Sequence, residues 1–366
     1  MADGETHGRP SCPLSGRLMR YCFFAPGSYA ENPSLVRALC LGRELAARGI
    51  DVCYVADDIP GNRQAGVFDP AATIAYVPNP RSFGQFAARR RAIAGLAPDF
   101  VHVINTAPKT FMGLVGTRWK MVADYDEWPA GRPHRFWRRK REQFFESWAI
   151  RRATHAIACS RYLQRQFEAV HGRKVAYIPY AVDLQEPPAA ASPFTQPTAV
   201  YMGTFSKPYD LDLLFHAAKI LADKGLRPRM CFVGKGPQWE MWKAYVEDNG
   251  LDNIELTGWL DDTAMWSRLR HAHVLLFPIR PSIPNLARCP FKTYFYAKAR
   301  RPIIVNRTGE VPAVLENRAT YVECTPQAFA EAIESAMSNR SLVDVDYLVE
   351  RHNWQARADE LLSLLA

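Results

Sequence analysis

The chain has 366 residues, of which 48% are hydrophobic and 23% are charged. This composition excludes a disordered, collagen-like or disulfide-framework protein, and the length predicts more than one globular domain. No apolar run reaches the roughly 18 residues of a membrane-spanning helix. The eight cysteines form no Cys-x-x-Cys pair, which favours reduced thiols in a cytoplasmic protein. Residues 1–17 are polar and are predicted to be a loose tail, not a signal peptide.

Positive charge is concentrated in the first half of the chain. The formal net charge is +9, and residues 1–185 hold 26 Lys and Arg against 16 Asp and Glu, whereas residues 186–366 hold 20 against 21. A basic half indicates contact with an anionic membrane surface, a nucleic acid or an acidic acceptor, or else a solvated basic face.

The first half alternates short apolar runs with amphipathic stretches. Strands are predicted at 18–25, 51–56, 73–77, 100–104, 121–124, 155–159 and 175–178. Helices are predicted at 34–48, 86–96 and 136–152, with one more between the last two strands. This alternation is typical of an open parallel sheet that helices cover on both faces.

A Pro-rich segment at 185–197 predicts an interdomain linker, and the alternation restarts after it. Strands are predicted at 199–202, 230–233, 254–257, 274–277 and 303–305, and helices at 211–224, 238–249, 262–270, 291–299, 327–338 and 354–364. We therefore expect an α/β protein with one domain at 18–184, a second at 198–345, and a C-terminal segment at 346–366 that crosses back to the first domain.

Arg288 and Lys292 flank the start of the predicted helix 291–299, where Pro290 suits the first turn. Cations at this end oppose the helix macrodipole, which favours anions there. A phosphate group bound between the two cations explains their position, and the alternative is that both point to solvent.

Two glycine-containing loops of the second domain are further candidates for a phosphate site. Gly234, Lys235 and Gly236 follow a predicted strand and open a helix, where backbone amides can approach an anion. Gly203, Thr204 and Lys207 follow the first strand of that domain and offer a second wall. Plain strand–helix turns are the alternative for both loops, since a lone Gly-x-Gly is a weak signal.

Polar residues at strand ends are the candidates in the first domain. Asp124 and Asp126 follow an apolar strand and could orient hydroxyls or act as acid and base, with helix capping or a metal site as alternatives. Asn105 ends the strand 100–104. His102, which lies between two valines, is expected to be a core histidine.

Residues 132–152 combine eight basic residues with five Phe and Trp side chains. This pattern suits a membrane interface, and an ordinary amphipathic helix explains it equally well. RNA binding is a third interpretation, but the chain holds no nucleic-acid motif.

In these residues the chain resembles the GT-B-fold glycosyltransferases of the retaining, family-4-like type (glycosyl transferases group 1). The resemblance lies in the order and spacing of a series of segments. The series comprises Ala156–Ser160, Val175–Asp183, Tyr201–Leu214, Phe232–Pro237, Ile254–Leu260 and Pro290–Val305.

The resemblance implies two Rossmann-like domains that face each other across a cleft, with the acceptor on the first and a nucleotide-diphosphate sugar on the second. Arg288 and Lys292 would act on the diphosphate, and Asn105, Asp124 and Asp126 would orient the acceptor or sugar hydroxyls. Donor contacts would come from Gly203, Thr204, Lys207, Gly234, Lys235, Gly236, Leu260, Asn285 and Tyr296. Gly27 and Ser28 would face the cleft from the first domain.

The expected function is a hexosyltransferase that acts with retention on a polysaccharide, lipid-linked or glycoconjugate acceptor. It would need no metal and no cofactor, because fixed cations can stabilise the leaving diphosphate. We expect a cytoplasmic protein, peripheral at the inner face of the membrane through residues 132–152, without nucleic-acid partners.

The chain departs from the family pattern at two positions where glutamates are usual, which are Ala287 and Phe295 here. Arg300 and Arg301 replace a usual glycine before Pro302. These departures leave a catalytically degenerate sugar-binding or partner subunit as the alternative, and a nucleotide-sugar epimerase as a third reading.

Overall fold

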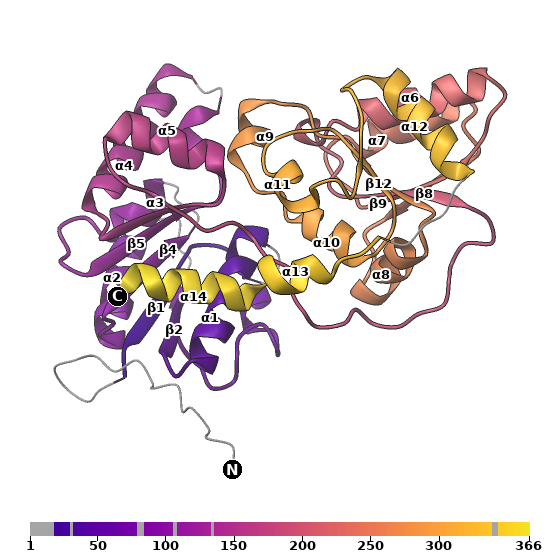
Figure 1. The fold of residues 1–366 in the computed structure, drawn as a ribbon. Helices are drawn as coiled ribbons and strands as arrows, with labels where there is room; N and C mark the ends of the chain where they lie inside the picture. The colour runs from indigo at the N-terminus through magenta and orange to yellow at the C-terminus, as the bar shows by residue number, and fades with distance from the viewer. Residues whose placement is uncertain (1–17, 30–31, 79–83, 105–107, 133–134, 339–342) are drawn as a thin grey trace, which may run out of the picture. The chain divides into compact units, whose positions relative to one another are not determined.

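The computed structural model describes residues 18–29, 32–78, 84–104, 108–132, 135–338 and 343–366. The chain forms two compact units (Figure 1). The first unit comprises Met1–Tyr180 with Trp354–Ala366, and the second comprises Ala181–Asn353. Each unit is built around its own parallel sheet.

The first unit has a seven-stranded parallel sheet in the order β3-β2-β1-β4-β5-β6-β7. The strands are β1 (Arg20–Phe24), β2 (Asp51–Asp58), β3 (Thr73–Pro78), β4 (Phe100–Ile104), β5 (Lys120–Tyr125), β6 (His155–Ala158) and β7 (Ala176–Tyr177). The connecting helices are α1 (Pro33–Ala47), η1 (Pro60–Arg63), α2 (Gly84–Leu96), α3 (Pro108–Met112), η2 (Pro129–Gly131), α4 (Phe136–Arg152) and α5 (Arg161–His171).

Local capping explains where several of these helices begin and end. The Asn32 side chain accepts the Ser34 N–H before α1, and the Ser160 side chain accepts the Leu163 N–H before α5. Gly172 ends α5 in the left-handed conformation, with φ +61°.

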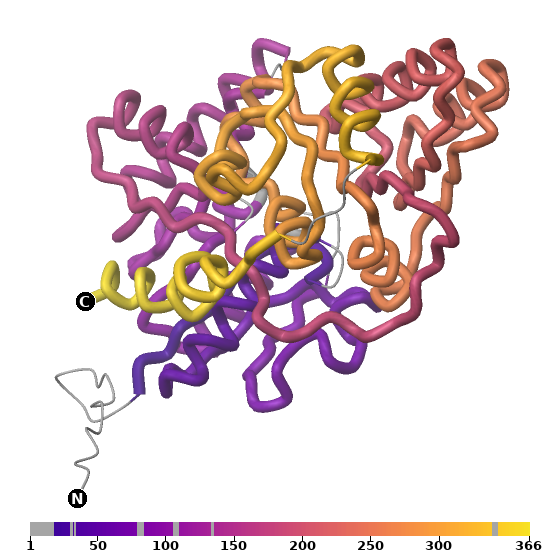
Figure 2. Tube along the Cα trace, turned by 45° about the vertical axis from the view of Figure 1, so that its right-hand side comes forward, coloured from indigo at the N-terminus to yellow at the C-terminus, as the bar shows by residue number. Residues whose placement is uncertain are grey.

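The last helix, α14 (Trp354–Leu365), belongs to the first unit, although the whole second unit precedes it in the chain. It packs on α1, and both views show the yellow helix beside the indigo one (Figures 1 and 2). Arg48, at the end of α1, donates to the Asp359 carboxylate at 2.7 Å.

The second unit has a six-stranded parallel sheet in the order β10-β9-β8-β11-β12-β13. The strands are β8 (Thr198–Met202), β9 (Arg229–Val233), β10 (Ile254–Gly258), β11 (Val274–Phe277), β12 (Ile303–Val305) and β13 (Thr320–Tyr321). The helices are η3 (Lys207–Tyr209), α6 (Asp212–Asp223), α7 (Trp239–Asp248), α8 (Asp262–His271), α9 (Ile283–Ala287), α10 (Lys292–Lys298), α11 (Val311–Leu315), α12 (Pro326–Met337) and α13 (Asp346–Arg351). The prediction of an α/β fold with two Rossmann-like domains is confirmed.

The Pro-rich segment at 185–197 is irregular and belongs to the second unit, which begins at Ala181. Ser267 of α8 donates to the Ala191 carbonyl at 2.6 Å, and Lys298 of α10 donates to the carbonyls of Asp183 and Gln185. These side chains therefore fix the segment along the helices of the second unit.

Candidate functional site

The candidate donor site lies where the second sheet reverses its winding. Strands β8 and β11 are neighbours, and the chain winds from β8 towards β10 on one side and from β11 towards β13 on the other. Ligands of open α/β sheets bind at the carboxyl ends of the strands at such a switch point. Gly203 follows β8, Gly234 follows β9 and Leu260 follows β10, so all three lie at this edge.

Tyr296 of α10 bridges the two central strands. Its hydroxyl accepts the Met202 N–H at 2.8 Å and donates to the Leu276 carbonyl at 3.2 Å. The ladder between β8 and β11 pairs only Val274 with Ala199 and Leu275 with Val200. Tyr296, which was predicted among the donor contacts, therefore joins the strands where they diverge, below the edge of the sheet.

The glycines of the two loops allow their backbones to meet. Gly234 has φ +120°, and a Cβ there would lie 2.2 Å from the Gly203 carbonyl oxygen. A Cβ on Gly236 would lie 2.6 Å from the carbonyl oxygen of Phe205. The Phe205 N–H donates to the Lys235 carbonyl at 3.2 Å. These glycines are thus required for the contact between the loops, in addition to any contact with a ligand.

Lys292, at the start of α10, carries the clearest signal for an anionic ligand. Its side chain is half-buried, but its Nζ is buried and has no hydrogen-bond partner in the described part of the chain. Nζ lies 4.1 Å from the ring centroid of Tyr201, 5.1 Å from that of Phe277 and 5.5 Å from that of Tyr209. Burial, and then the nearby Arg288 charge, lower the pKa of Lys292 well below its usual value.

Gly203 makes room for this ammonium group, because a Cβ there would lie 2.7 Å from Lys292 Nζ. Arg288 lies beside it, with its guanidinium carbon 5.0 Å from the ring centroid of Tyr209. Its Nε is buried and has no hydrogen-bond partner among the residues that the structure describes. Two neighbouring cations whose buried nitrogens lack acceptors form a site for a polyanion such as a diphosphate.

The remaining predicted donor residues lie on the same edge of the sheet but differ in their surroundings. Lys207 and Lys235 are exposed, and Thr204 and Leu260 are half-buried. Asn285 is buried, and its amide donates to the Arg280 carbonyl at 2.8 Å and to the Asp210 carboxylate at 3.3 Å. Asn285 therefore holds the loop after β11, with its Oδ1 left unpartnered.

Asp124, at the end of β5, is the centre of a buried polar network in the first unit. Its Oδ2 accepts from Arg37 Nε at 2.7 Å and lies 3.1 Å from His102 Nε2, and all three side chains are fully buried. His102 Nδ1 lies 2.8 Å from the Tyr21 hydroxyl, so His102 is a core histidine, as the sequence predicted. Burial disfavours the Asp124 carboxylate, but Arg37 and His102 outweigh this effect and lower its pKa.

Arg37 ties this network to the backbone, since it also donates to the carbonyls of Pro179 and Ile178 at 2.8 and 2.7 Å. The sequence analysis missed Arg37, which lies 87 residues from Asp124. The surroundings of Asp124 suit positioning of this strand end more than contact with a substrate.

Asp126 is also buried, and in the described part of the chain only one of its carboxylate oxygens accepts a hydrogen bond. Its Oδ2 accepts from the Tyr180 hydroxyl at 3.1 Å, and its Oδ1 has no partner among the described residues. Burial raises the pKa of its carboxyl. Asp124 also keeps an Oδ1 without a partner among the described residues, so what separates the two carboxylates is exposure: Asp126 is 7% accessible and Asp124 is fully buried. Asn105, the third predicted residue of this unit, lies outside the described residues.

The loop after β1 is held by residues that the sequence analysis also missed. The Gly27 N–H donates to Asp57 Oδ2 at 3.0 Å, and Asp57 Oδ1 accepts from Arg89 at 2.7 Å. Asn62 donates to the Gly27 carbonyl at 2.9 Å and accepts the Tyr29 N–H at 2.7 Å. The loop is therefore fixed from the end of β2.

Helix α4 carries the predicted basic, aromatic stretch. It exposes Phe136, Trp137 and Phe144, with 54%, 81% and 65% of their surfaces accessible. Arg138 and Arg141 are also largely exposed, whereas Glu142 and Glu146 are buried. A groove of about 400 Å³ is lined by Phe144, Ser147, Trp148, Arg151 and Arg152.

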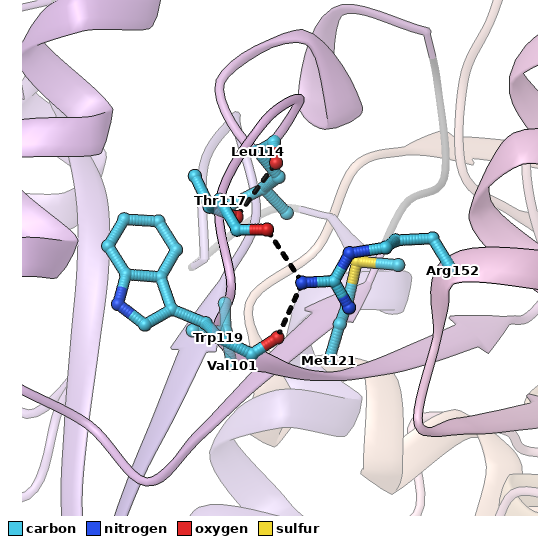
Figure 3. Close-up of a pocket in the computed structure, with 6 residues that line it drawn as sticks. All are labelled: Val101, Leu114, Thr117, Trp119, Met121 and Arg152. Atoms are coloured by element: carbon cyan, nitrogen blue, oxygen red, sulfur yellow. Dashed lines mark hydrogen bonds between the residues drawn. The ribbon is translucent and has the colours of Figure 1, made fainter.

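The end of α4 is fixed to the preceding loop by Arg152. Figure 3 shows its guanidinium between the carbonyls of Thr117 and Trp119, at 2.7 and 3.1 Å. The crevice there is also lined by Met121 and is too narrow for a ligand. Among the residues that the structure describes, no helix is long and apolar enough to cross a membrane. Nor do those residues bring three His, Cys, Asp or Glu side chains together as a metal site would.

Two protein-family models match the chain. The model described as Glycosyltransferase Family 4 matches residues 36–186, and the model described as Glycosyl transferases group 1 matches residues 196–339. Between them they span most of both units. A sequence search of curated proteins found no match.

Solved structures share the fold over nearly the whole chain. A sucrose-phosphate synthase from Thermosynechococcus elongatus has a TM-score of 0.76 at 15% identity, covering 95% of this chain and 98% of that one. Anabaena HepE in complex with UDP has a TM-score of 0.69 at 13% identity, covering 95% and 99%. The lipopolysaccharide outer core galactosyltransferase WaaB has a TM-score of 0.65 at 15% identity, covering 95% and 99%. These similarities show a GT-B fold.

Proposed function

We propose a function for this chain from the family to which it belongs: it is a group 1 (family 4) glycosyltransferase with the GT-B fold. It transfers a hexosyl group from a nucleoside diphosphate sugar to a hydroxyl of a polysaccharide, lipid-linked or glycoconjugate acceptor. The transfer retains the anomeric configuration and needs no metal ion.

The observation that carries this proposal is the buried, unpartnered ammonium of Lys292 beside Arg288, at the switch point of the second sheet. During transfer the bond between the anomeric carbon and the diphosphate oxygen breaks, and the diphosphate gains negative charge. Lys292 and Arg288 are fixed before the reaction, so they can stabilise this charge without reorganisation. Fixed cations of this kind are the basis for proposing transfer without a metal.

Asp126 is the proposed acceptor-side residue, since it is the less completely buried of the two carboxylates and its Oδ1, which has no partner in the described part of the chain, can accept the hydrogen bond of an acceptor hydroxyl. Asp124 holds the end of β5 in place for it. The choice of first donor comes from two structural neighbours: HepE was solved with UDP and with UDP-glucose, and TarM from S. aureus with UDP and alpha-GlcNAc-glycerol. UDP-sugars are therefore the first donors to test.

The test is a turnover assay on UDP-, GDP-, dTDP- and CDP-hexoses with sugar acceptors, with and without EDTA. We expect one nucleotide series to be consumed, with retention seen by NMR of the product and no effect of EDTA. Lys292→Met should lower kcat by about 10²–10³-fold, as loss of a transition-state cation does. Lys243→Met, at an exposed lysine of α7, is the matched control and should leave the rate unchanged.

A degenerate sugar-binding or partner subunit is the rival function, and one observation favours it. Phe295 stacks on Trp266, with ring centroids 5.1 Å apart and planes 13° apart, so an aromatic pair stands where the family has a glutamate. Binding of one nucleotide without turnover of any donor would support this rival and contradict transfer. Product formed without an acceptor would indicate an epimerase instead.

We also propose that α4 attaches the first unit to anionic membranes, because aromatic side chains and arginines are exposed together on it. Flotation with phosphatidylglycerol vesicles, but not with phosphatidylcholine vesicles, is the expected result. Reversing the charges of Arg138, Arg139 and Lys140 should abolish it. Met241→Ala, at an exposed apolar residue of α7, should not. Vesicle binding that survives the charge reversal would contradict the attachment.

A further inference from the structure

A cavity of the second unit lies away from the donor site, at the opposite edge of the sheet. It has a volume of about 410 Å³ and lies where α8 and α10 end and where β12 begins. Its apolar lining includes Leu184, Leu348 and Val349. The volume lies within the ~300–1,000 Å³ range of small-molecule sites.

Four cations line this cavity: Arg270, Lys298, Arg300 and Arg301. Among the described residues that line it are two carboxylates, those of Asp183 and Glu186, and the Glu186 side chain is 83% exposed. Several of the cations donate to backbone carbonyls, as Lys298 does to Asp183 and Gln185 and Arg301 does to Arg270. Carbonyl partners orient Lys298 and Arg301 without cancelling their charge, whereas Arg270 lies 3.9 Å from the Glu186 carboxylate.

Arg300 adopts a backbone conformation that disfavours its side chain. Its φ is +55°, in the left-handed region, and its N–H donates to the Ala297 carbonyl at 3.1 Å as the residue that follows a helix. Glycine, which has no Cβ, takes this conformation without penalty, whereas an L-residue such as arginine costs the folded state roughly 1 kcal/mol of stability there. Its ion pair with Asp346, at 3.3 Å, is largely exposed and returns little of that energy. The ion pair therefore does not explain why an arginine occupies this position, and ligand binding by its side chain would explain it.

We propose that this cavity binds a phosphate ester with an apolar organic group, such as an isoprenoid diphosphate. The four cations would hold the phosphate groups, and the apolar lining would receive the organic part. The donor site proposed above does not depend on this cavity. Helix α10 separates the two sites, because Lys292 begins it and Lys298 ends it.

The test is calorimetric titration with geranyl diphosphate, inorganic pyrophosphate and geraniol. We expect geranyl diphosphate to bind about tenfold or more tightly than either of the other two probes, since only it uses both parts of the cavity. Equal affinity for pyrophosphate would overturn the apolar part of the proposal, and absence of binding would overturn all of it.

Two variants test whether the ligand binds in this cavity. Arg300→Gly removes a cation and the disfavoured backbone conformation, so the variant should keep or raise its melting temperature while its Kd for geranyl diphosphate rises about threefold or more. Val349→Glu should weaken binding because it places a carboxylate in the apolar part of the cavity. Val349 is 51% exposed, so we expect the variant to fold. Arg227→Gln, at a distant surface arginine paired with Asp252, is the control and should bind normally.

Lys292→Met separates this cavity from the nucleotide site. Geranyl diphosphate should bind this variant as it binds the unmodified protein, whatever happens to nucleotide binding. Loss of geranyl diphosphate binding in Lys292→Met, with normal binding by Arg300→Gly, would put the ligand at the switch point and overturn the proposal.

Discussion

Lys292 combines a charge with surroundings that do not accept its hydrogen bonds. Three aromatic rings and Arg288 surround its buried Nζ. The free protein therefore loses stability to hold this cation in place, as binding sites commonly do. An anion that enters the site supplies the missing acceptor and restores the ordinary preference of lysine for its charged form.

Lys292→Met should stabilise the free protein by about 1–3 kcal/mol, because it replaces a buried, unpaired cation with an apolar side chain of similar length. The lowered pKa of Lys292 also predicts how the free energy of unfolding changes with pH. Stability of the unmodified protein should rise as pH rises through this lowered pKa towards that of an unfolded lysine, since only the unfolded chain still binds the proton there. The variant should lack this rise. Chemical denaturation at several pH values measures both effects, and a less stable variant would contradict the argument.

Arg37 and Asp124 are the second residue-level case. Arg37→Met should destabilise the protein by about 3–5 kcal/mol, because it leaves the Asp124 carboxylate buried without its main partner. The double variant Arg37→Met with Asp124→Leu should recover much of this loss. Urea denaturation of the unmodified protein, Arg37→Met and the double variant tests this expectation. A double variant as unstable as Arg37→Met would contradict the claim that the loss comes from the unpaired Asp124 carboxylate.

The sequence predicted the cations of the donor site but not their burial. Arg288 and Lys292 were identified from charge at a helix start, which a local pattern can show. The contacts of Tyr296 with Met202, and of Arg37 with Asp124, join residues 94 and 87 positions apart, and no local pattern contains them. For this reason the sequence predicted a role for Asp124 in orienting hydroxyls, but not its pairing with Arg37 or its complete burial.

At the scale of elements, α10 supports the site by joining the two strands that diverge. Tyr296→Phe removes the acceptor of the Met202 N–H and the donor to the Leu276 carbonyl. Both backbone groups then lose a partner, so we expect a loss of about 1–3 kcal/mol and weaker nucleotide binding. Thermal denaturation and calorimetry measure the two effects. Tyr245→Phe on α7 is the control, and equal effects of the two changes would argue against a bridge.

Helix α4 is anchored through Glu146, which accepts from Trp128 Nε1 at 2.8 Å and lies 3.2 Å from His171 Nε2. Burial raises its pKa from 4.5 to about 7. The folded protein then binds a proton that the unfolded chain releases, so stability should fall as pH rises from about 4.5 to about 7. Glu146→Gln should remove this fall, a gain of about 3 kcal/mol at pH 8 and none near pH 4. Parallel pH profiles of the two proteins would contradict the account.

At the scale of the whole molecule, the alternation of strands and helices was enough to predict two parallel sheets. Each long strand and helix was expected near its observed position, because apolar periodicity is strong over such lengths. The short elements α3, α9, α11, α13 and β13 escaped prediction, since two to six residues hold too little pattern. The Pro-rich segment was predicted to be an interdomain linker, and its contacts with α8 and α10 come from the tertiary structure.

In the reaction that we propose, the second unit binds the donor and the first unit binds the acceptor. The second unit offers paired cations at a switch point, and the first offers Asp126 with a fixed loop after β1. The excess of positive charge belongs to the first half of the sequence, where α4 exposes arginines with aromatic side chains. The central claim concerns the second unit: the phosphates of a nucleotide bind at Lys292 and Arg288.

The most direct test is calorimetric titration of the protein with UDP, GDP, dTDP and CDP, repeated with Lys292→Met and Lys243→Met. The account predicts that one nucleotide binds the unmodified protein and Lys243→Met alike. It predicts about a hundredfold or greater loss of affinity for Lys292→Met, together with proton uptake on binding to the unmodified protein and to Lys243→Met, both of which keep Lys292. Undiminished nucleotide binding by Lys292→Met would contradict it, as would the failure of all four nucleotides to bind.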